Sequence, residues 1–176
     1  MTDWMSLLPE PLAPGLTEEY LDEVESRYGF RFAADHREML AAALPVGPGF
    51  PDWRTDSDDL RRRLVAPADG VLFDVEHNAF WYDGWGARPS GDAAARAVAV
   101  ERLAAAPPLV PVYGHRYLPG TGGGAGHPVL SVHQTDIVVY GADLPRYLRA
   151  EFGAGTGADL TAGAVCTVPF WSDLVS

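Results

Sequence analysis

The sequence predicts an α+β fold in a single domain, in which helices pack against a mixed, mostly antiparallel sheet of about four to six strands. Two observations support this prediction. Residues 109–141 contain short β-branched and aromatic runs separated by glycine and proline, which is typical of strands. Segments with the apolar spacing of amphipathic helices lie before and after them. A chain of 176 residues with 47% hydrophobic residues is long enough to bury one core.

Charge and cysteine content exclude several kinds of function. The chain has 24 acidic residues against 13 arginines and no lysine, which gives a net charge of -11. Nucleic acid is therefore not an expected direct ligand, because phosphate contacts need a cationic surface. An acidic surface favours a basic protein partner instead. The chain has one cysteine, Cys166, which excludes an internal disulfide or a thiolate metal cluster. It lies in an apolar run, where cysteine behaves as a small hydrophobe.

The N-terminal residues 1–15 are rich in proline and read as an arm that Trp4, Leu7 and Leu8 attach to the body. They lack the basic and apolar regions of a signal peptide. No apolar run approaches the eighteen residues of a membrane-spanning helix. We therefore expect a cytoplasmic protein that does not contact a membrane.

Three helices are predicted next. The first covers Leu16–Gly29, with Thr17 as N-cap and Gly29 as the C-terminal stop. The second opens at Asp35, where Glu38 completes a capping box, and ends at Pro45. After an irregular loop at 46–54, the third covers about Asp56–Val65.

Residues Val71–Tyr82 alternate between apolar and polar residues, which predicts a strand, or two with a bend. Asp74 and Glu76 would then share its outer face. A turn at 83–86 and a helix from Ser90 or Asp92 to about Ala106 follow. The later elements expected are strands at Leu109–Tyr113, Val129–His133 and Asp136–Tyr140, a short strand near Arg116–Leu118, a helix from Asp143 to Phe152, and a tail at Val168–Val175 that docks on the core.

No catalytic motif is complete. The glycine run at 120–126 lacks the lysine and the following helix of a phosphate-binding loop, and we expect a flexible loop there. The histidines do not have metal-ligand spacing, and no cofactor or resident metal is expected. A small metal-dependent hydrolase that uses Asp74, Glu76 and His77 remains a less favoured alternative.

Five residues are candidates for a partner-binding surface. They combine acidic side chains with tryptophans in loops, where aromatic residues cap a core or anchor an interface. The set is Asp52, Trp53, Asp74, Glu76 and Trp85.

The order of these signals resembles the SUKH superfamily, which includes yeast cell-wall assembly regulators and bacterial toxin-immunity proteins. The resemblance rests on the two-helix opening LTEEYLDEVESRYGFRFAADHREMLAAALPVG and on the later segments LVPVYGHRYLP, VLSVHQTDIVVYG and DLPRYLRAEF. It covers roughly 16–152. Residues 16–176 would form one SUKH-like domain, with glycine-rich loops at 119–127 and 153–164.

The resemblance implies a binding role without catalytic residues. The favoured hypothesis is an immunity-type module whose acidic face neutralises a basic, nuclease-like toxin domain. The alternative is an intracellular regulatory scaffold, which the sequence does not distinguish from the first.

Overall fold

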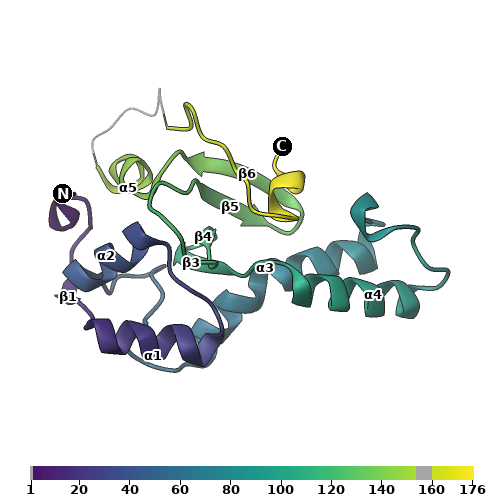
Figure 1. Ribbon diagram of the computed structural model, residues 1–176, viewed down its shortest axis with the longest axis horizontal. Helices are drawn as coiled ribbons and strands as arrows, with labels where there is room; N and C mark the ends of the chain where they lie inside the picture. Colours follow the sequence, from purple (N-terminus) through teal and green to yellow (C-terminus); the bar gives the residue numbers. More distant parts are fainter. Residues whose placement is uncertain (1, 154–159) are drawn as a thin grey trace.

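A four-stranded antiparallel sheet, in the order β3-β4-β5-β6, lies at the centre of the computed structural model, with helices around it (Figure 1). The structure describes residues 2–153 and 160–176. The strands are β3 (Leu109–Tyr113), β4 (Arg116–Pro119), β5 (Val129–His133) and β6 (Asp136–Gly141). The helices are α1 (Glu18–Tyr28), α2 (Ala34–Ala42), α3 (Asp58–His77), α4 (Asp92–Ala105) and α5 (Leu144–Phe152). The predicted α+β class is confirmed.

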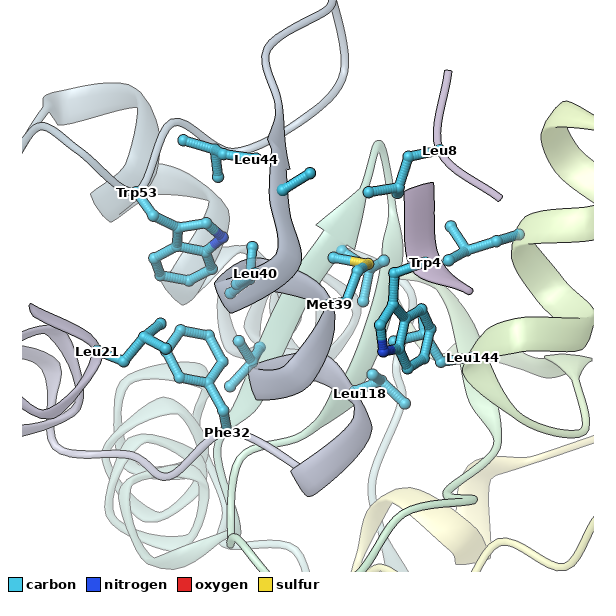
Figure 2. Close-up of a cluster of buried hydrophobic side chains, with 14 of the residues drawn as sticks. Trp4, Leu8, Leu21, Phe32, Met39, Leu40, Leu44, Trp53, Leu118 and Leu144 are labelled. Carbon is cyan, nitrogen blue, oxygen red and sulfur yellow. The ribbon is translucent and has the colours of Figure 1, made fainter. Parts of the chain in front are cut away.

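The two faces of the sheet bury separate hydrophobic cores. Because side chains alternate along a strand, Val129 of β5 points into the first core and Leu130 points into the second. The first core lies between the sheet, the N-terminal residues, α1, α2 and α5 (Figure 2). The second core is filled by α3, α4 and the C-terminal residues. The sheet itself is therefore covered on both sides.

The first helix follows its sequence signals. The Thr17 hydroxyl accepts a hydrogen bond from the Tyr20 amide at 3.2 Å, and Gly29 ends α1 with φ +71°, a left-handed conformation that favours glycine. The second helix differs at its start. It begins at Ala34 without a side-chain cap, so the predicted capping box of Asp35 and Glu38 is wrong.

The predicted strand at Val71–Tyr82 is also wrong. Residues 58–77 form the single 20-residue helix α3, which runs twelve residues past the predicted end at Val65. Val71 and Val75 are four residues apart, a spacing that places them on one face of a helix and also on one face of a strand. Phe73, which a strand would have placed beside them, is 45% exposed. The alternation was therefore coincidental.

Two residues that normally break helices are accommodated in α3 by contacts with the sheet. Pro67 cannot donate the helical hydrogen bond to the Arg63 carbonyl, and the Tyr117 hydroxyl of β4 donates to that carbonyl instead at 3.1 Å. Gly70 lets the β5–β6 turn approach the helix closely. A Cβ atom at Gly70 would lie 2.9 Å from the Cα of Gln134.

Asp74, one helical turn after Gly70, fixes the same β5–β6 turn. Its carboxylate accepts hydrogen bonds from the amide and hydroxyl of Thr135, at 2.9 and 2.6 Å, and from the Asn78 side chain at 2.6 Å. The turn contains Gln134 at φ +56°, which is uncommon for a residue other than glycine. Burial opposes ionisation, but these hydrogen bonds hold the pKa of Asp74 below its usual value. Asp74 is thus a buried structural carboxylate.

Both ends of the chain pack into the fold. Trp4, Leu7 and Leu8 are buried in the first core, and β1 (Leu12–Pro14) pairs antiparallel with β2 (Ala43–Pro45). At the other end, Trp171 is buried and donates its indole N–H to the Pro107 carbonyl at 2.7 Å, which confirms the docked tail. Residues 154–159 of the predicted glycine-rich loop lie outside the described residues.

We predict that Asp74→Ala lowers the free energy of unfolding by about 2–3 kcal/mol, because three hydrogen-bond donors lose a charged acceptor. Asp69→Ala is the matched control. Asp69 is exposed on the same helix, and its loss should cost no more than about 0.5 kcal/mol. Urea denaturation of both variants measures the difference. Equal costs would contradict the role given to Asp74.

His36 is a second buried polar residue, in the first core. It is 1% exposed, packs edge-on against Phe32, and neither ring nitrogen has a hydrogen-bond partner. Burial lowers the pKa of His36 to about 3. The folded protein therefore holds this ring neutral, whereas the unfolded chain takes up a proton below about pH 6.5.

His36→Phe should therefore change the pH dependence of stability. Wild-type stability from this group is fully present above about pH 6.5 and declines toward pH 3, by at most about 1.4 kcal/mol per pH unit. The variant should lose this component and keep its stability at pH 7 within about 1 kcal/mol. Urea melts of both proteins at pH 5 and pH 7 test this, and an equal loss of stability between the two pH values in wild type and variant would contradict it.

Candidate functional site

An open groove lies between the end of α1 and the chain that leaves β4. It has a volume of about 750 Å³. Asp22, Glu25 and Ser26 of α1 form one wall. The remaining lining residues come from the segment after α1 and from the two ends of the β3–β4 hairpin, and they are Gly29, Phe30, Arg31, Pro108, Gly120 and Thr121.

Backbone pairing between two distant segments builds the groove. The Arg31 amide donates to the Gly120 carbonyl at 2.8 Å, and the Gly122 amide donates to the Arg31 carbonyl at 3.1 Å, so residues 31 and 121 form a parallel bridge. A side chain at Gly120 would lie 2.8 Å from Val110 and 3.0 Å from the Pro108 carbonyl. Glycine is therefore required for this close approach.

The glycine-rich run that follows is held by a buried carboxylate. Asp35 is 4% exposed and accepts hydrogen bonds from the Gly126 amide at 2.9 Å and from the His36 amide at 3.0 Å. Burial raises the pKa of Asp35, and both hydrogen bonds oppose that rise. The run at 120–126 is thus attached to the α1–α2 segment near both of its ends, by Arg31 and by Asp35.

Glu25 organises the charges of the α1 wall. It is 4% exposed and accepts hydrogen bonds from the Phe32 amide at 2.9 Å and from Arg31 at 2.8 Å. Arg37 lies 3.3 Å from Glu25 and also pairs with the exposed Glu18 and Asp22, at 2.7 and 2.8 Å. Arg37 therefore links the buried carboxylate of Glu25 to the exposed carboxylates of Glu18 and Asp22.

The exposed side of α1 is acidic. Residues 17–29 contain five acidic residues and one arginine. The side chains of Glu18 and Asp22 are each 65% exposed, and that of Glu23 is 57% exposed. We call this surface, made of Glu18, Glu19, Asp22, Glu23 and the adjacent groove, the acidic α1 face.

Arginines offset part of this charge, because Arg37 pairs with Glu18 and Asp22 and Arg27 pairs with Glu23. All thirteen lie in residues 2–153, and ten of them form ion pairs with carboxylates of the same chain. Because 24 acidic residues outnumber these 13 arginines, negative charge remains in excess after the ion pairs are formed.

The structure places the two predicted tryptophans inside the protein. Trp53 is 1% exposed and packs edge-on against Phe32, with ring centroids 5.1 Å apart. Trp85 is 9% exposed and stacks on Phe170 at 5.5 Å. Neither side chain is exposed as an interface anchor, because each loop folds its ring onto a core. The predictions for Trp53 and Trp85 are wrong in this respect.

The predicted acidic residues do not form one surface. Asp74 is buried under the β5–β6 turn, while Glu76 is exposed and pairs with Arg96 of α4. On a helix, residues two apart point in nearly opposite directions, so the carboxylates of Asp74 and Glu76 lie on different sides of α3. Asp52 is exposed, and its hydrogen bond with Arg54 lowers its pKa.

The alternative hydrolase set also separates. The Nδ1 group of His77 donates a hydrogen bond to the Phe73 carbonyl oxygen at 3.0 Å, and the His77 ring stacks on the Phe73 ring. Within residues 2–153 and 160–176, no three histidine, cysteine, aspartate or glutamate side chains gather closely enough to hold a metal ion. No helix in this part of the chain is long and apolar enough to cross a membrane.

Sequence reasoning missed Glu25 and assigned Asp35 only to a helix cap, not to the glycine-rich run that it holds. Glu25 is four residues after Leu21 and therefore lies in the apolar stripe of the first helix, a position that indicates burial. That signal was available. The groove itself depends on the pairing of residue 31 with residue 121, which no local pattern predicts.

Comparison with protein-family models, with curated proteins and with solved structures finds no match to this chain. The candidate site is therefore defined by its own geometry and charge.

Glu25→Ala should destabilise the protein by about 2–4 kcal/mol, because it removes a buried carboxylate and unpairs Arg31 and the Phe32 amide. Glu23→Ala on the exposed side of α1 breaks only its pair with Arg27 and should cost no more than about 0.5 kcal/mol. Thermal or urea unfolding distinguishes them. A Glu25 variant as stable as the Glu23 variant would show that the network is dispensable.

Proposed function

We propose that this protein is a non-catalytic binding module of the immunity type, which neutralises a basic, nuclease-like toxin domain by binding it through the acidic α1 face. The observation that supports this most directly is the combination of exposed carboxylates on α1 with an open groove beside them. The resemblance to the SUKH superfamily, which includes immunity proteins, points to the same class.

The groove has the composition that a lysine or arginine side chain of a partner requires. Asp22 and Glu25 supply carboxylates, while Phe30 and Pro108 supply apolar surface. Long basic side chains bury their aliphatic stems against apolar groups and direct their charge toward carboxylates. A basic residue of the partner would compete with Arg31, whose side chain is 70% exposed, for the anchored Glu25.

The net charge of -11 would also attract a basic partner at long range. Opposite charges on two proteins raise the rate of association and select against wrong partners. Enzymes that cleave nucleic acids present cationic surfaces to phosphates. An acidic protein that covers such a surface blocks the substrate by occupying its charge-complementary site.

A regulatory scaffold inside the cell is the alternative role for the same surface. The two roles differ in the partner and not in the mode of binding. Capture of a toxin domain encoded beside the gene, together with protection of cells that express it, supports immunity. Specific binding of a basic partner without protection supports the scaffold.

We predict that Ser26→Arg, which places a cation in the groove, weakens binding of a basic toxin domain encoded beside the gene at least about tenfold. At low salt the loss should come mainly from slower association. Ala97→Arg is the control, because it also adds one positive charge, at an exposed position of α4 that does not line the groove. Calorimetry and stopped-flow mixing measure both. Equal losses in the two variants would exclude the α1 face, and failure of the wild-type protein to bind would exclude the module itself.

A further inference from the structure

Arg116 is a half-buried cation without a carboxylate partner. It lies on β4, where its Nη1 atom donates to the Ser131 hydroxyl at 3.1 Å and its Cζ atom stands 3.7 Å from the centre of the Tyr140 ring. Its Nε atom is buried and has no hydrogen-bond partner. Among the described residues, no carboxylate lies within ion-pair distance of it.

Other arginines of this chain show how unusual that is. The side chains of Arg37, Arg63 and Arg88 are 21%, 22% and 29% exposed, and each pairs with a carboxylate. Arg102 and Arg149 also form no ion pair, but they are exposed, where water solvates the charge. Arg116 alone combines partial burial with the lack of a counter-charge.

A second buried polar atom without a hydrogen-bond partner belongs to a tyrosine that packs near Tyr140. Tyr147 of α5 is fully buried, and its hydroxyl has no hydrogen-bond partner. Its ring is 6.2 Å from the ring of Tyr140, which in turn covers the Arg116 guanidinium. Burial raises the pKa of Tyr147, and the nearby Glu151 charge raises it further, whereas Arg116 lowers it. The hydroxyl therefore stays protonated and can donate.

Arg116 and the Tyr147 hydroxyl are both hydrogen-bond donors without an acceptor, so the same kind of ligand would satisfy them. A buried donor without an acceptor costs free energy, and a partly buried guanidinium costs more when no anion faces it. Arg116 offers donors only, and Tyr147 offers a proton. A carboxylate has two acceptor oxygens and matches the planar fork of arginine.

We propose that Arg116, Tyr147 and Ser131 form a binding site for a carboxylate, between α5 and the face of the sheet that α5 covers. Tyr140 is the cover of this site. Its side chain is 39% exposed and stacks on the guanidinium, so the ligand enters when this ring rotates away. The site is independent of the acidic α1 face. The carboxylate comes either from a small molecule or from the end of a peptide chain.

The test follows the Nε–H signal of Arg116 by ¹⁵N NMR in the full-length protein. Acetate should shift the signal saturably, while chloride at the same ionic strength should not. A short peptide with a free C-terminus is compared with its amidated form. Tighter binding of the free peptide than of acetate identifies a chain end as the ligand, and the reverse identifies a small carboxylate. Equal responses to acetate and chloride, or no response to any carboxylate probe, overturn the site.

Variants then assign the donors. Tyr147→Phe removes only the hydroxyl and should weaken acetate binding about fivefold, the loss expected for one hydrogen bond. Binding to the variants is followed by the backbone amide signal of Ser131, because Arg116→Gln removes the Nε–H probe. Arg116→Gln should abolish binding, whereas Arg149→Gln, which makes the same charge change at an exposed residue of α5, should leave it unchanged. Circular dichroism confirms folding in each case. Loss of binding in the Arg149 variant equal to that in the Arg116 variant would contradict the proposal.

Discussion

The contact between α3 and the β5–β6 turn is the interaction on which the rest of the structure depends. Gly70 removes the side chain that would hold the turn away, and Asp74 then binds the turn through Thr135. The Tyr117 hydroxyl takes over the helical bond that Pro67 cannot make. These contacts place a long helix along the sheet, and α4 packs back against it to close the second core (Figure 1).

With α3 and α4 covering one face of the sheet, the other face is left to the N-terminal half of the chain. There α1 and α2 form the first core, and the turn after α1 pairs with the chain that leaves β4. The acidic α1 face is a consequence of that arrangement. Its buried carboxylate, Glu25, fixes the wall of the groove, so the exposed carboxylates stand on a rigid support rather than on a loop.

Local signals in the sequence were sufficient for most elements. Thr17, Gly29 and Asp143 mark helix ends by mechanisms that need only neighbouring residues, and the strands from Leu109 onward follow their alternation. The failures involve tertiary contacts. Residues 58–77 contain a proline and a glycine that predict a break in the helix. A residue of β4 replaces the hydrogen bond that the proline cannot make, and the glycine allows the β5–β6 turn to pack closely. The candidate residues Asp74 and Trp53 failed for the same reason, because burial by distant segments decided their roles.

The length of α3 has one further consequence, which concerns cooperativity. Leu60 near its first turn is buried in the first core, while Val71 and Val75 toward its other end are buried in the second. One continuous helix therefore belongs to both cores, and neither can melt without exposing part of a helix that the other needs. The two sides of the sheet therefore unfold as one unit. Binding that stabilises one core should also slow amide hydrogen exchange in the other.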